Sequence, residues 1–405
     1  MFDICVVGAG ASGMTAAIAA KSVAPHLRVA IIERNDRVGK KLALTGNGRC
    51  NISNENISVE NYHGENPRFC EYALSNFDLN KTKEFFEKLG VIFKSESGGK
   101  LYPYSYQASS VVDAMRFAIE RLGVKLITDC EITAVKKEDS GFLFSGKSQL
   151  QSKTIIIAAG GKSGGKIASD SGYRLLTSLG HTVTPLYPAI VQIRTDTSLT
   201  RQLKGVKVNA TVSVLKNGKS VENDYGEVLF CDYGLSGPPV LQLSRYLKRG
   251  DEVSLDLMPE YSPSELCEII NRRTENLIGC DCAEFFAGML QKRLGQVILK
   301  SVGININDSA DFTSAQINSI ANRIKDFRFE FECTNGFQNA QVTHGGAETR
   351  YFSDKTMMSK KCDGLYACGE VLDIDGDCGG FNLQWAWSSG YIAGVSAAKA
   401  LEGKK

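Results

Sequence analysis

The sequence of 405 residues has no C-x-x-C motif, although it contains 12 cysteines. The closest pairs are Cys280 with Cys282 and Cys362 with Cys368, which lack the spacing of a dithiol relay or a structural zinc site. Scattered cysteines of this kind are typical of a reducing compartment, where they remain thiols. We therefore expect neither a disulfide relay of the thioredoxin-reductase type nor a bound metal.

Long hydrophobic runs and blocks of one charge are also missing. No stretch approaches ~18 uninterrupted apolar residues, the length that a membrane span needs. A first strand is expected within about three residues of Met1, which leaves no room for a signal peptide. The 47 basic and 45 acidic residues give a formal net charge of +2, which argues against a dedicated nucleic-acid surface. These absences predict a cytoplasmic protein with no membrane or nucleic-acid partner.

The composition that remains is that of a globular protein of more than one domain. Hydrophobic residues make up 43% and charged residues 23% of the chain, so a large core is available. A chain of this length exceeds the size at which one core keeps growing, so two or three compact units are expected.

Three glycines near the start of the chain have the G-x-G-x-x-G spacing of dinucleotide-binding proteins. Gly8, Gly10 and Gly13 follow an apolar run at 4–7 and precede an alanine-rich stretch at 14–21. This strand–turn–helix context is what the motif requires. The first glycine permits a tight turn, the second lets a pyrophosphate approach the backbone, and the third allows close packing. N–H groups of the first helical turn then attract the anion.

An acid and a basic loop follow the glycine motif. Glu33 ends a second apolar run about 20 residues after the last glycine, where a carboxylate can accept hydrogen bonds from a ribose. The loop at 39–51 combines basic side chains, small residues and amides, which suits a segment along a pyrophosphate that reaches toward a flavin ring. A solvated basic loop is the alternative.

The C-terminal part supplies a second glycine-rich segment. Gly369 and Glu370 follow a predicted strand at 364–368, and Gly379-Gly380 opens a last predicted helix. N–H groups at such a helix start can stabilise the negative charge of a reduced flavin. NAD enzymes do not need a segment of this kind, so it favours FAD over NAD.

The two segments and the strand ends between them yield a set of expected ligand contacts. The strand at 154–159 ends in small residues, either for close approach to the cofactor or as an ordinary core strand. The cofactor-binding candidates are Gly8, Gly10, Ala11, Ser12, Gly13, Glu33, Arg34, Lys41, Asn47, Gly48, Arg49, Cys50, Ile132, Ala159, Gly160, Gly369, Glu370, Asp373, Gly380, Phe381 and Asn382.

The pattern along the chain predicts an α/β domain interrupted by an insertion. Residues 1–189 and 346–405 alternate strand-like and helix-like stretches, which predicts a discontinuous dinucleotide-binding domain with a parallel sheet. Residues 190–257 and 326–345 are β-rich, with Asn217-Gly218 as a hairpin signal. Residues 258–325 are expected to be helical, with one helical stretch from Ser264, as N-cap, to about residue 300.

Several strings resemble the BaiN-like (YhiN-like) FAD-dependent oxidoreductases. The most distinctive are T-G-N-G-R-C-N at 45–51 and G-G-F-N…W-A-W-S-S-G at 379–390, and the resemblance covers essentially the whole chain. It implies a Rossmann-like, glutathione-reductase-type FAD domain with an inserted β-barrel-like domain and a small helical domain. The segment at 162–173 departs from the usual family string.

The expected activity is hydride transfer from NAD(P)H through the flavin to an organic acceptor, by reduction of a C=C or C=O bond. No second G-x-G-x-x-G follows a strand in residues 160–345, so NAD(P)H is expected to visit the flavin face transiently. Two alternatives stay open. One is a flavin-dependent RNA-modifying enzyme, and the other is a flavin-binding redox sensor without enzymatic activity.

Three side chains are candidates for catalysis. His344 is one of four histidines and stands beside Gly345-Gly346; histidine suits proton transfer near neutral pH, although a structural role is more common. Cys50, next to Arg49, is either a low-pKa thiol or a packing residue. Tyr104 could line a pocket or donate a proton.

Overall fold

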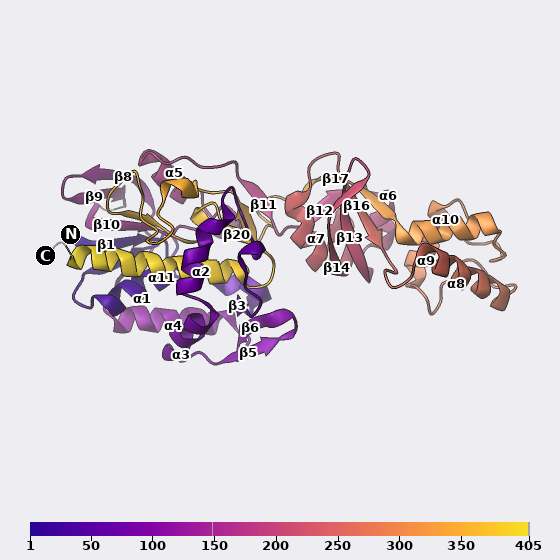
Figure 1. Ribbon diagram of the computed structural model, residues 1–405, viewed down its shortest axis with the longest axis horizontal. Coiled ribbons are helices and arrows are strands. Elements are labelled where there is room, and N and C mark those ends of the chain that lie inside the picture. The colour runs from indigo at the N-terminus through magenta and orange to yellow at the C-terminus, as the bar shows by residue number, and fades with distance from the viewer. Residues whose placement is uncertain (148, 404–405) are drawn as a thin grey trace. The chain divides into compact units, whose positions relative to one another are not determined.

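The computed structural model describes residues 1–147 and 149–403 and divides the chain into two units (Figure 1). Met1–Pro188 and Gln341–Lys405 form the first, here called the sheet unit, and Ala189–Ala340 form the second, the barrel unit. Among the described residues, no helix combines the length and the hydropathy needed to span a membrane.

The sheet unit is built on a seven-stranded sheet whose centre is parallel. In sheet order the strands are β7 (Lys125–Ile127), β2 (Val29–Ile32), β1 (Phe2–Val7), β10 (Leu150–Ile157), β9 (Gly141–Gly146) and β8 (Ile132–Glu138), with β19 (Leu365–Ala367) paired to the end of β10. All of β2 and the last five residues of β1 are buried, because helices cover both faces of a parallel sheet.

Within residues 1–147, 149–188 and 341–403, six α-helices and three small sheets complete this unit. The helices are α1 (Ala11–Val23), α2 (Glu71–Asn76), α3 (Leu79–Lys88), α4 (Ala108–Arg121), α5 (Ser171–Ser178) and α11 (Phe381–Glu402). The small sheets pair β3 (Ser53–Asn54), β6 (Lys100–Pro103) and β5 (Phe93–Glu96); β4 (Tyr62–His63) with β20 (Asp375–Gly376); and β11 (Tyr187–Ala189) with β18 (Val342–His344).

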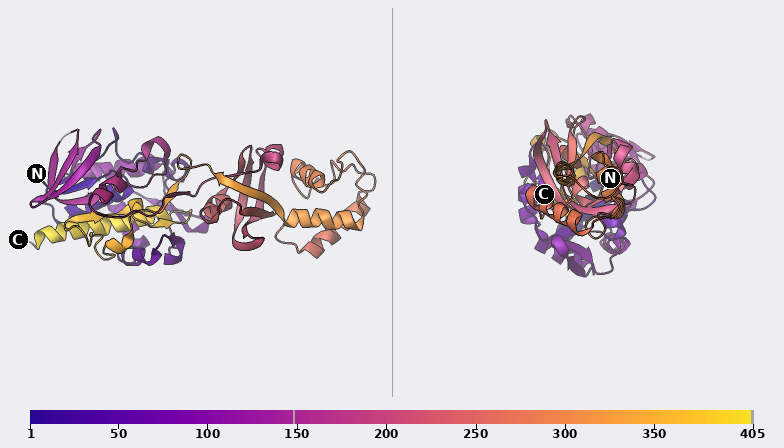
Figure 2. Two further views of the ribbon diagram at one scale, coloured as in Figure 1. Left: turned by 90° about the horizontal axis from the view of Figure 1, so that it is seen from above. Right: turned by 90° about the vertical axis from the view of Figure 1, so that its right-hand side faces the viewer.

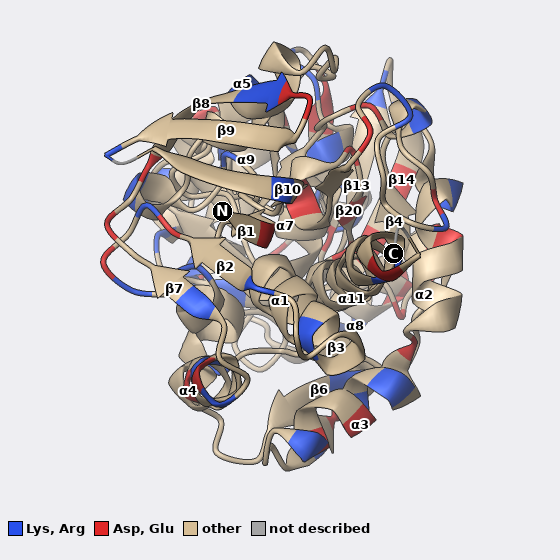
Figure 3. Cartoon of the chain, turned by 90° about the vertical axis from the view of Figure 1, so that its left-hand side faces the viewer, with Lys and Arg blue, Asp and Glu red and all other residues tan. Residues whose placement is uncertain are grey.

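Helices α1 and α11 pack directly on each other, although they come from opposite ends of the chain (Figure 3). A Cβ atom on Gly390 would lie 2.4 Å from the Ser12 carbonyl oxygen, and one on Gly394 would lie 2.1 Å from the Ala16 oxygen. These glycines, one turn apart, let the two backbones touch. The start of β1 and the end of α11 lie at the same end of the unit in two orthogonal views (Figures 1 and 2).

Buried polar contacts fix α11 against α3 and β3. The Gln384 side chain is fully buried, donates to Phe77 O, Thr82 Oγ1 and Ser388 Oγ, and accepts from the Ser53 hydroxyl at 2.6 Å. Trp387 is also fully buried and donates its indole N–H to Ile52 O at 2.9 Å. The long C-terminal helix is therefore the centre of this unit's core.

The barrel unit contains a closed six-stranded antiparallel barrel and five helices. In barrel order the strands are β12 (Ile193–Thr195), β15 (Gly234–Ser236), β14 (Lys219–Cys231), β13 (Lys207–Lys216), β16 (Glu252–Asp256) and β17 (Phe327–Thr334). The helices are α6 (Thr197–Thr200), α7 (Pro238–Leu243), α8 (Pro263–Asn276), α9 (Lys292–Ser301) and α10 (Ser314–Lys325). The expected α/β sheet with an inserted barrel is thus confirmed. A separate helical subdomain at 258–325 stays a prediction, because its buried residues share one cluster with those of the barrel.

Two local predictions in this unit have different outcomes. Asn217 and Gly218 have φ values of 51° and 74° and join β13 to β14, as a two-residue hairpin turn requires. The single helix predicted from Ser264 to about 300 is wrong. Ser262 is the N-cap and forms a capping box with Glu265, and the helix ends at Asn276, so that fifteen residues separate it from the start of α9 at Lys292.

A buried histidine gives the sheet unit an acid-sensitive contact. His181 is 2% exposed, stacks on Phe352 at 4.5 Å between ring centroids, and its Nε2 lies 2.9 Å from the Ser359 hydroxyl. Burial, with a smaller effect of Lys361, lowers the pKa of His181 from 6.5 to about 4.

We expect His181 to weaken the folded state as the pH falls from about 6.5 to 4. In that window the unfolded chain takes up a proton that the folded protein does not. The contribution of neutral His181 to the stability of the fold is therefore fully present only above the unfolded pKa. The loss amounts to about 3 kcal/mol, at roughly 1.4 kcal/mol for each pKa unit between the two states. Urea unfolding of wild type and His181→Gln at neutral and acidic pH measures it. His26→Gln, at an exposed histidine, is the control, and an equal pH dependence in all three proteins would contradict the prediction.

Candidate functional site

The glycine turn between β1 and α1 leaves one position open. Gly8 has a φ of +106°, and a Cβ there would lie 2.4 Å from Ala158 O, whereas a Cβ on Gly13 would lie 2.0 Å from Gly8 O. These two glycines are required by the protein's own packing. A Cβ on Gly10 would meet no atom within 4 Å. The open space at Gly10, in front of the first turn of α1 with Ala11 and Ser12, is what a pyrophosphate needs for close approach.

Glu33 is fixed against this turn. Its carboxylate is 8% exposed; Oε2 accepts the Ala9 N–H at 2.8 Å, and Oε1 accepts the Asn35 N–H at 2.8 Å. The Cys130 N–H donates to Glu33 O at 2.9 Å, which places the start of β8, with buried Ile132, beside the same residue. An anchored carboxylate next to the glycine turn matches the geometry of a ribose contact.

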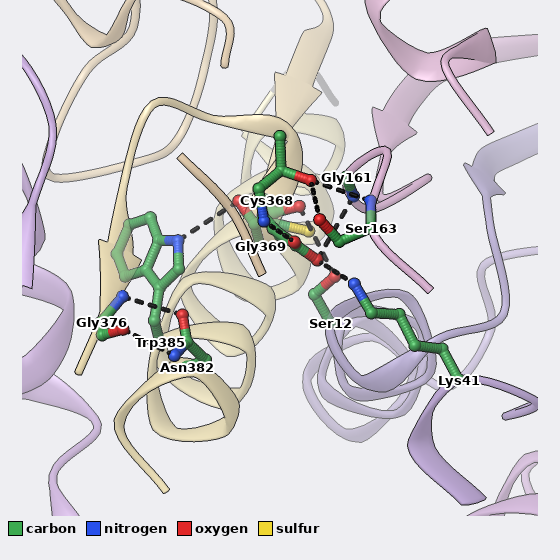
Figure 4. A network of polar contacts seen from close by, with 11 residues as sticks. Ser12, Lys41, Gly161, Ser163, Cys368, Gly369, Gly376, Asn382 and Trp385 are labelled. Carbon is green, nitrogen blue, oxygen red and sulfur yellow. Dashed lines mark hydrogen bonds and ion pairs between the residues drawn. The ribbon is translucent and has the colours of Figure 1, made fainter. Parts of the chain in front are cut away.

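A second group of polar contacts, which includes Lys41, Gly161 and Ser163 (Figure 4), gathers at the carboxyl ends of β10 and β19. The Glu370 carboxylate is its centre. Its Oε2 lies 2.6 Å from Lys41 Nζ and accepts the Gly161 N–H at 3.3 Å, while Oε1 accepts the Thr343 N–H at 2.8 Å. The Thr343 hydroxyl in turn contacts Ser163 Oγ at 3.0 Å. The Glu370 carboxylate therefore ties together four segments at the edge where α/β proteins bind ligands.

The basic residues predicted to contact the cofactor have protein partners. Lys41 is paired with Glu370, and Arg34 donates to Ala168 O at 2.6 Å. The Arg49 guanidinium lies 4.7 Å from the centre of the Tyr102 ring. Sequence reasoning did not find these partners, because they lie far away in the chain.

The loop at 45–50 has a strained, left-handed backbone. Gly46, Asn47, Gly48 and Cys50 have φ values of 58°, 55°, 81° and 59°. The side chain of Cys50 is fully buried, and burial raises the pKa of its thiol to about 12. The hypothesis of a low-pKa thiol at Cys50 is therefore corrected, since desolvation of the thiolate outweighs any effect of Arg49.

The C-terminal segment closes on the N-terminal one. The Gly369 N–H donates to Ser389 Oγ at 2.9 Å, and a Cβ on Gly369 would lie 2.5 Å from Ser12 Oγ. A Cβ on Gly380 would lie 2.4 Å from Ser53 O. The structure thus brings the two glycine-rich segments together, as the sequence predicts.

Other candidates of this segment make internal contacts. Asn382 Oδ1 accepts the Gly376 N–H at 2.8 Å, and its Nδ2 donates to Gly376 O, so this amide shapes the turn before α11. The Tyr62 hydroxyl donates to Phe381 O at 3.1 Å. Asp373 accepts the Glu65 N–H at 3.1 Å, and burial raises the pKa of its carboxyl group.

At the end of β10, Ala159 and Gly160 behave differently. Ala159 is packed against Gly172, whose own Cβ would lie 2.8 Å from the Ala159 methyl group, whereas a Cβ on Gly160 would meet nothing within 4 Å. Gly160, like Gly10 and Gly48, is a glycine beside open space. These positions and the Glu33 carboxylate fit an extended dinucleotide such as FAD, which would supply hydride transfer when bound.

Two catalytic candidates have clear environments. His344 Nδ1 lies 2.7 Å from Oδ1 of Asp375, which is fully buried, while the His344 side chain stays 35% exposed. Tyr104 is 66% exposed just beyond β6, so its phenol is solvated rather than enclosed. Sequence reasoning did not assign Asp375 a role; its only signal was the alternation of acids in Asp373-Ile-Asp375-Gly-Asp377.

Comparison with known proteins agrees with this site. A family model described as the HI0933-like protein Rossmann domain matches residues 2–396. The chain is 38% identical to the 3-dehydro-bile acid delta(4,6)-reductase of Clostridium scindens, over 98% of this chain and 100% of that protein. It is 30% identical to the ribosomal RNA dihydrouridine synthase of Escherichia coli, over 96% of each. The prediction of no nucleic-acid partner is not confirmed, because that relative is named for ribosomal RNA.

Solved structures support the fold at low sequence identity. A quinol fumarate reductase of E. coli matches with a TM-score of 0.52 and 16% identity, over 100% of this chain and 71% of that chain. An open flavocytochrome c3 fumarate reductase matches with a TM-score of 0.50 and 16% identity, over 98% and 78%. The family match and the relatives show that the chain belongs to the HI0933-like Rossmann family and is an FAD-dependent oxidoreductase.

Proposed function

We propose that this protein takes hydride from NAD(P)H onto FAD and passes it to an organic acceptor, reducing a C=C bond that is conjugated to a carbonyl group. The observation that carries the proposal is the 38% identity, over 98% of the chain, to a reductase of 3-dehydro bile acids. The glycine turn and the anchored Glu33 carboxylate support the FAD part of it.

The names of the relatives point to one acceptor chemistry. A 3-dehydro bile acid with delta(4,6) unsaturation has C=C bonds conjugated to a ketone, and the uracil ring also has a C=C bond conjugated to a carbonyl. In both, the carbonyl makes one carbon electrophilic enough to accept hydride, and a proton completes the product. An enone-type acceptor is therefore a narrower proposal than reduction of C=C or C=O in general.

NAD(P)H is proposed to reach the flavin from solvent rather than from a second nucleotide domain. The stretch between the two halves of the sheet unit folds, in its described residues, as a closed barrel with helices. Its sequence has no second G-x-G-x-x-G after a strand. A nicotinamide that binds transiently at the flavin face is consistent with both observations.

Anaerobic stopped-flow spectroscopy tests the proposal in two steps. The purified holoprotein is mixed with NADH or NADPH, and bleaching of the flavin is followed. The reduced protein is then mixed with a 3-oxo-4,6-diene bile acid, the compound class named for the relative. Bleaching followed by fast reoxidation and a product heavier by two hydrogens is the expected result. If neither NADH nor NADPH bleaches the flavin, the proposal is overturned and a redox sensor is favoured.

The second candidate function is reduction of uridine in ribosomal RNA. It is favoured by the 29% and 30% identity to two dihydrouridine synthases, each over more than 95% of this chain. The near-balanced charge, 47 basic against 45 acidic residues, counts against it. Reoxidation of the reduced protein by an unmodified ribosomal RNA transcript, but not by the steroid, would decide for this function.

A further inference from the structure

Reduction of a conjugated C=C bond needs one proton for each hydride. The hydride and its electron pair form a new C–H bond at the electrophilic carbon, and the π electrons of the C=C bond shift toward the carbonyl, which becomes an enolate oxygen. A proton must then be added at the carbon next to the carbonyl, which restores the C=O bond. NAD(P)H is oxidised overall, and the acceptor gains two electrons and two hydrogens. A positioned acid accelerates such a step by roughly 10²–10⁴-fold.

Among the described contacts, His344 combines a buried carboxylate partner with a partly exposed ring at the edge of the sheet. Nδ1 of His344 lies 2.7 Å from Oδ1 of Asp375, Asp375 is 0% exposed, and the His344 side chain is 35% exposed. His181 is buried and stacked, so its ring is structural. His63 pairs with Asp377 at 2.7 Å, but that carboxylate is itself 18% exposed.

The position of His344 in the fold is fixed on both sides. Thr343, the preceding residue, is bound to Glu370 and Ser163 in the polar group at the carboxyl edge of the sheet. The following Gly345 has a φ of +92°, and a Cβ there would lie 2.3 Å from Pro185 O. These contacts fix the backbone on both sides of His344 and so restrict the orientation of its imidazole. They also place His344 one residue from the Glu370 network at the carboxyl edge of the sheet.

We propose that His344 is the acid that protonates the reduced acceptor, with Asp375 as the positioning residue that holds its ring. The Asp375 carboxylate accepts the Nδ1–H, which leaves Nε2 as the atom that transfers the proton. The charged groups around this pair are Asp373, whose carboxyl pKa is raised by burial, and His63 with Asp377; His63 is the register partner of Asp375 on the β4–β20 ladder. This inference rests on the proposed enone reduction.

The test separates the two half-reactions in His344→Gln and Asp375→Asn. Both variants should retain FAD and be bleached by NAD(P)H at the wild-type rate. Reoxidation by the 3-oxo-4,6-diene probe should fall about 100-fold or more in His344→Gln. In wild type this rate should decline as the pH rises and the imidazole loses its proton, and His344→Gln should lose that decline. Asp375→Asn should shift the decline of the reoxidation rate to lower pH. His26→Gln, at an exposed histidine outside this group of contacts, is the control and should behave like wild type.

Each result has a distinct meaning. Wild-type reoxidation rates and pH dependence in His344→Gln would overturn the role of His344 while leaving the proposed function intact. If wild type itself is bleached but not reoxidised by the probe, the acceptor proposal fails. The His344–Asp375 pair is then tested by labelling the native protein with diethylpyrocarbonate and locating the labelled histidines by mass spectrometry. Labelling of His344 ahead of His63, slowed in Asp375→Asn, supports an accessible, activated Nε2, and an unlabelled His344 overturns it.

Discussion

Replacement of Gly10 by valine is expected to leave the protein folded and to remove its flavin. A Cβ at this position meets no protein atom within 4 Å, and the backbone φ of −84° suits an L-residue. The branched side chain would fill the space through which a pyrophosphate approaches the first turn of α1. We expect the Kd for FAD to rise at least about 100-fold, which corresponds to about 2.7 kcal/mol. Titration of the apoprotein with FAD measures this directly.

Gly13→Ala is the informative contrast to Gly10→Val. Its Cβ would lie 2.0 Å from Gly8 O, so this variant should be destabilised even without the cofactor. Gly10→Val should change the unfolding free energy of the apoprotein by no more than about 1 kcal/mol, the cost of a poorer N-cap. Full flavin occupancy in Gly10→Val would show that the phosphates bind elsewhere.

The second large effect is expected at Gln384. Its buried side-chain amide donates hydrogen bonds to Phe77 O, Thr82 Oγ1 and Ser388 Oγ, and it accepts one from the Ser53 hydroxyl at 2.6 Å. Leucine of similar size would leave several of these groups without a hydrogen bond in a dry environment, at about 1–3 kcal/mol for each. We expect Gln384→Leu to lower the free energy of unfolding by about 3–5 kcal/mol, which is a large part of the stability of a typical domain.

Tryptophan fluorescence during urea unfolding measures this loss in the sheet unit alone. The chain has two tryptophans, Trp385 and Trp387, and both are buried on α11. Gln151→Leu is the control, because Gln151 is exposed on β10 and its replacement should cost no more than about 0.5 kcal/mol. Equal unfolding midpoints for the two variants would mean that the Gln384 network does not stabilise this unit.

The parallel core could be predicted from sequence because its signals are local. The apolar run at 4–7 and the second one, which Glu33 ends, are observed as the strands Phe2–Val7 and Val29–Ile32, since buried parallel strands are continuous apolar runs. The strand β14, which begins at Lys219 after the Asn217-Gly218 turn, has a weaker signal in the sequence. Its first half is exposed on both faces, so it has no alternation of apolar and polar residues to detect.

Helix boundaries in the barrel unit depended on competing local signals. Ser262 and Ser264 are both N-cap residues by type, and Glu265 decides for Ser262 because it completes the capping box. The end of α8 was missed because the following segment is held by contacts to 306–309, such as the Cys282 N–H to Asp308 O. Long-range contacts of this kind have no trace in a local pattern.

In the candidate site, too, local features could be predicted from the sequence and long-range contacts could not. The glycine turn and Glu33 follow from spacing along one βαβ unit, so their proximity was predictable. The pairs Lys41 with Glu370 and His344 with Asp375 form only when the sheet closes, and a single sequence contains no signal for them. The charge of Lys41 was visible in the sequence, but the carboxylate that balances it was not.

The late position of β19 and α11 in the chain has a consequence for biosynthesis. A ribosome releases β1, α1 and β10 first and then the whole barrel unit, before Leu365–Ala367 and Phe381–Glu402 emerge. Until that moment the groove on α1 that receives Gly390 and Gly394 stays uncovered. While the barrel unit is being synthesised, the nascent chain therefore lacks β19 and α11, and with them the C-terminal glycine-rich segment of the candidate site.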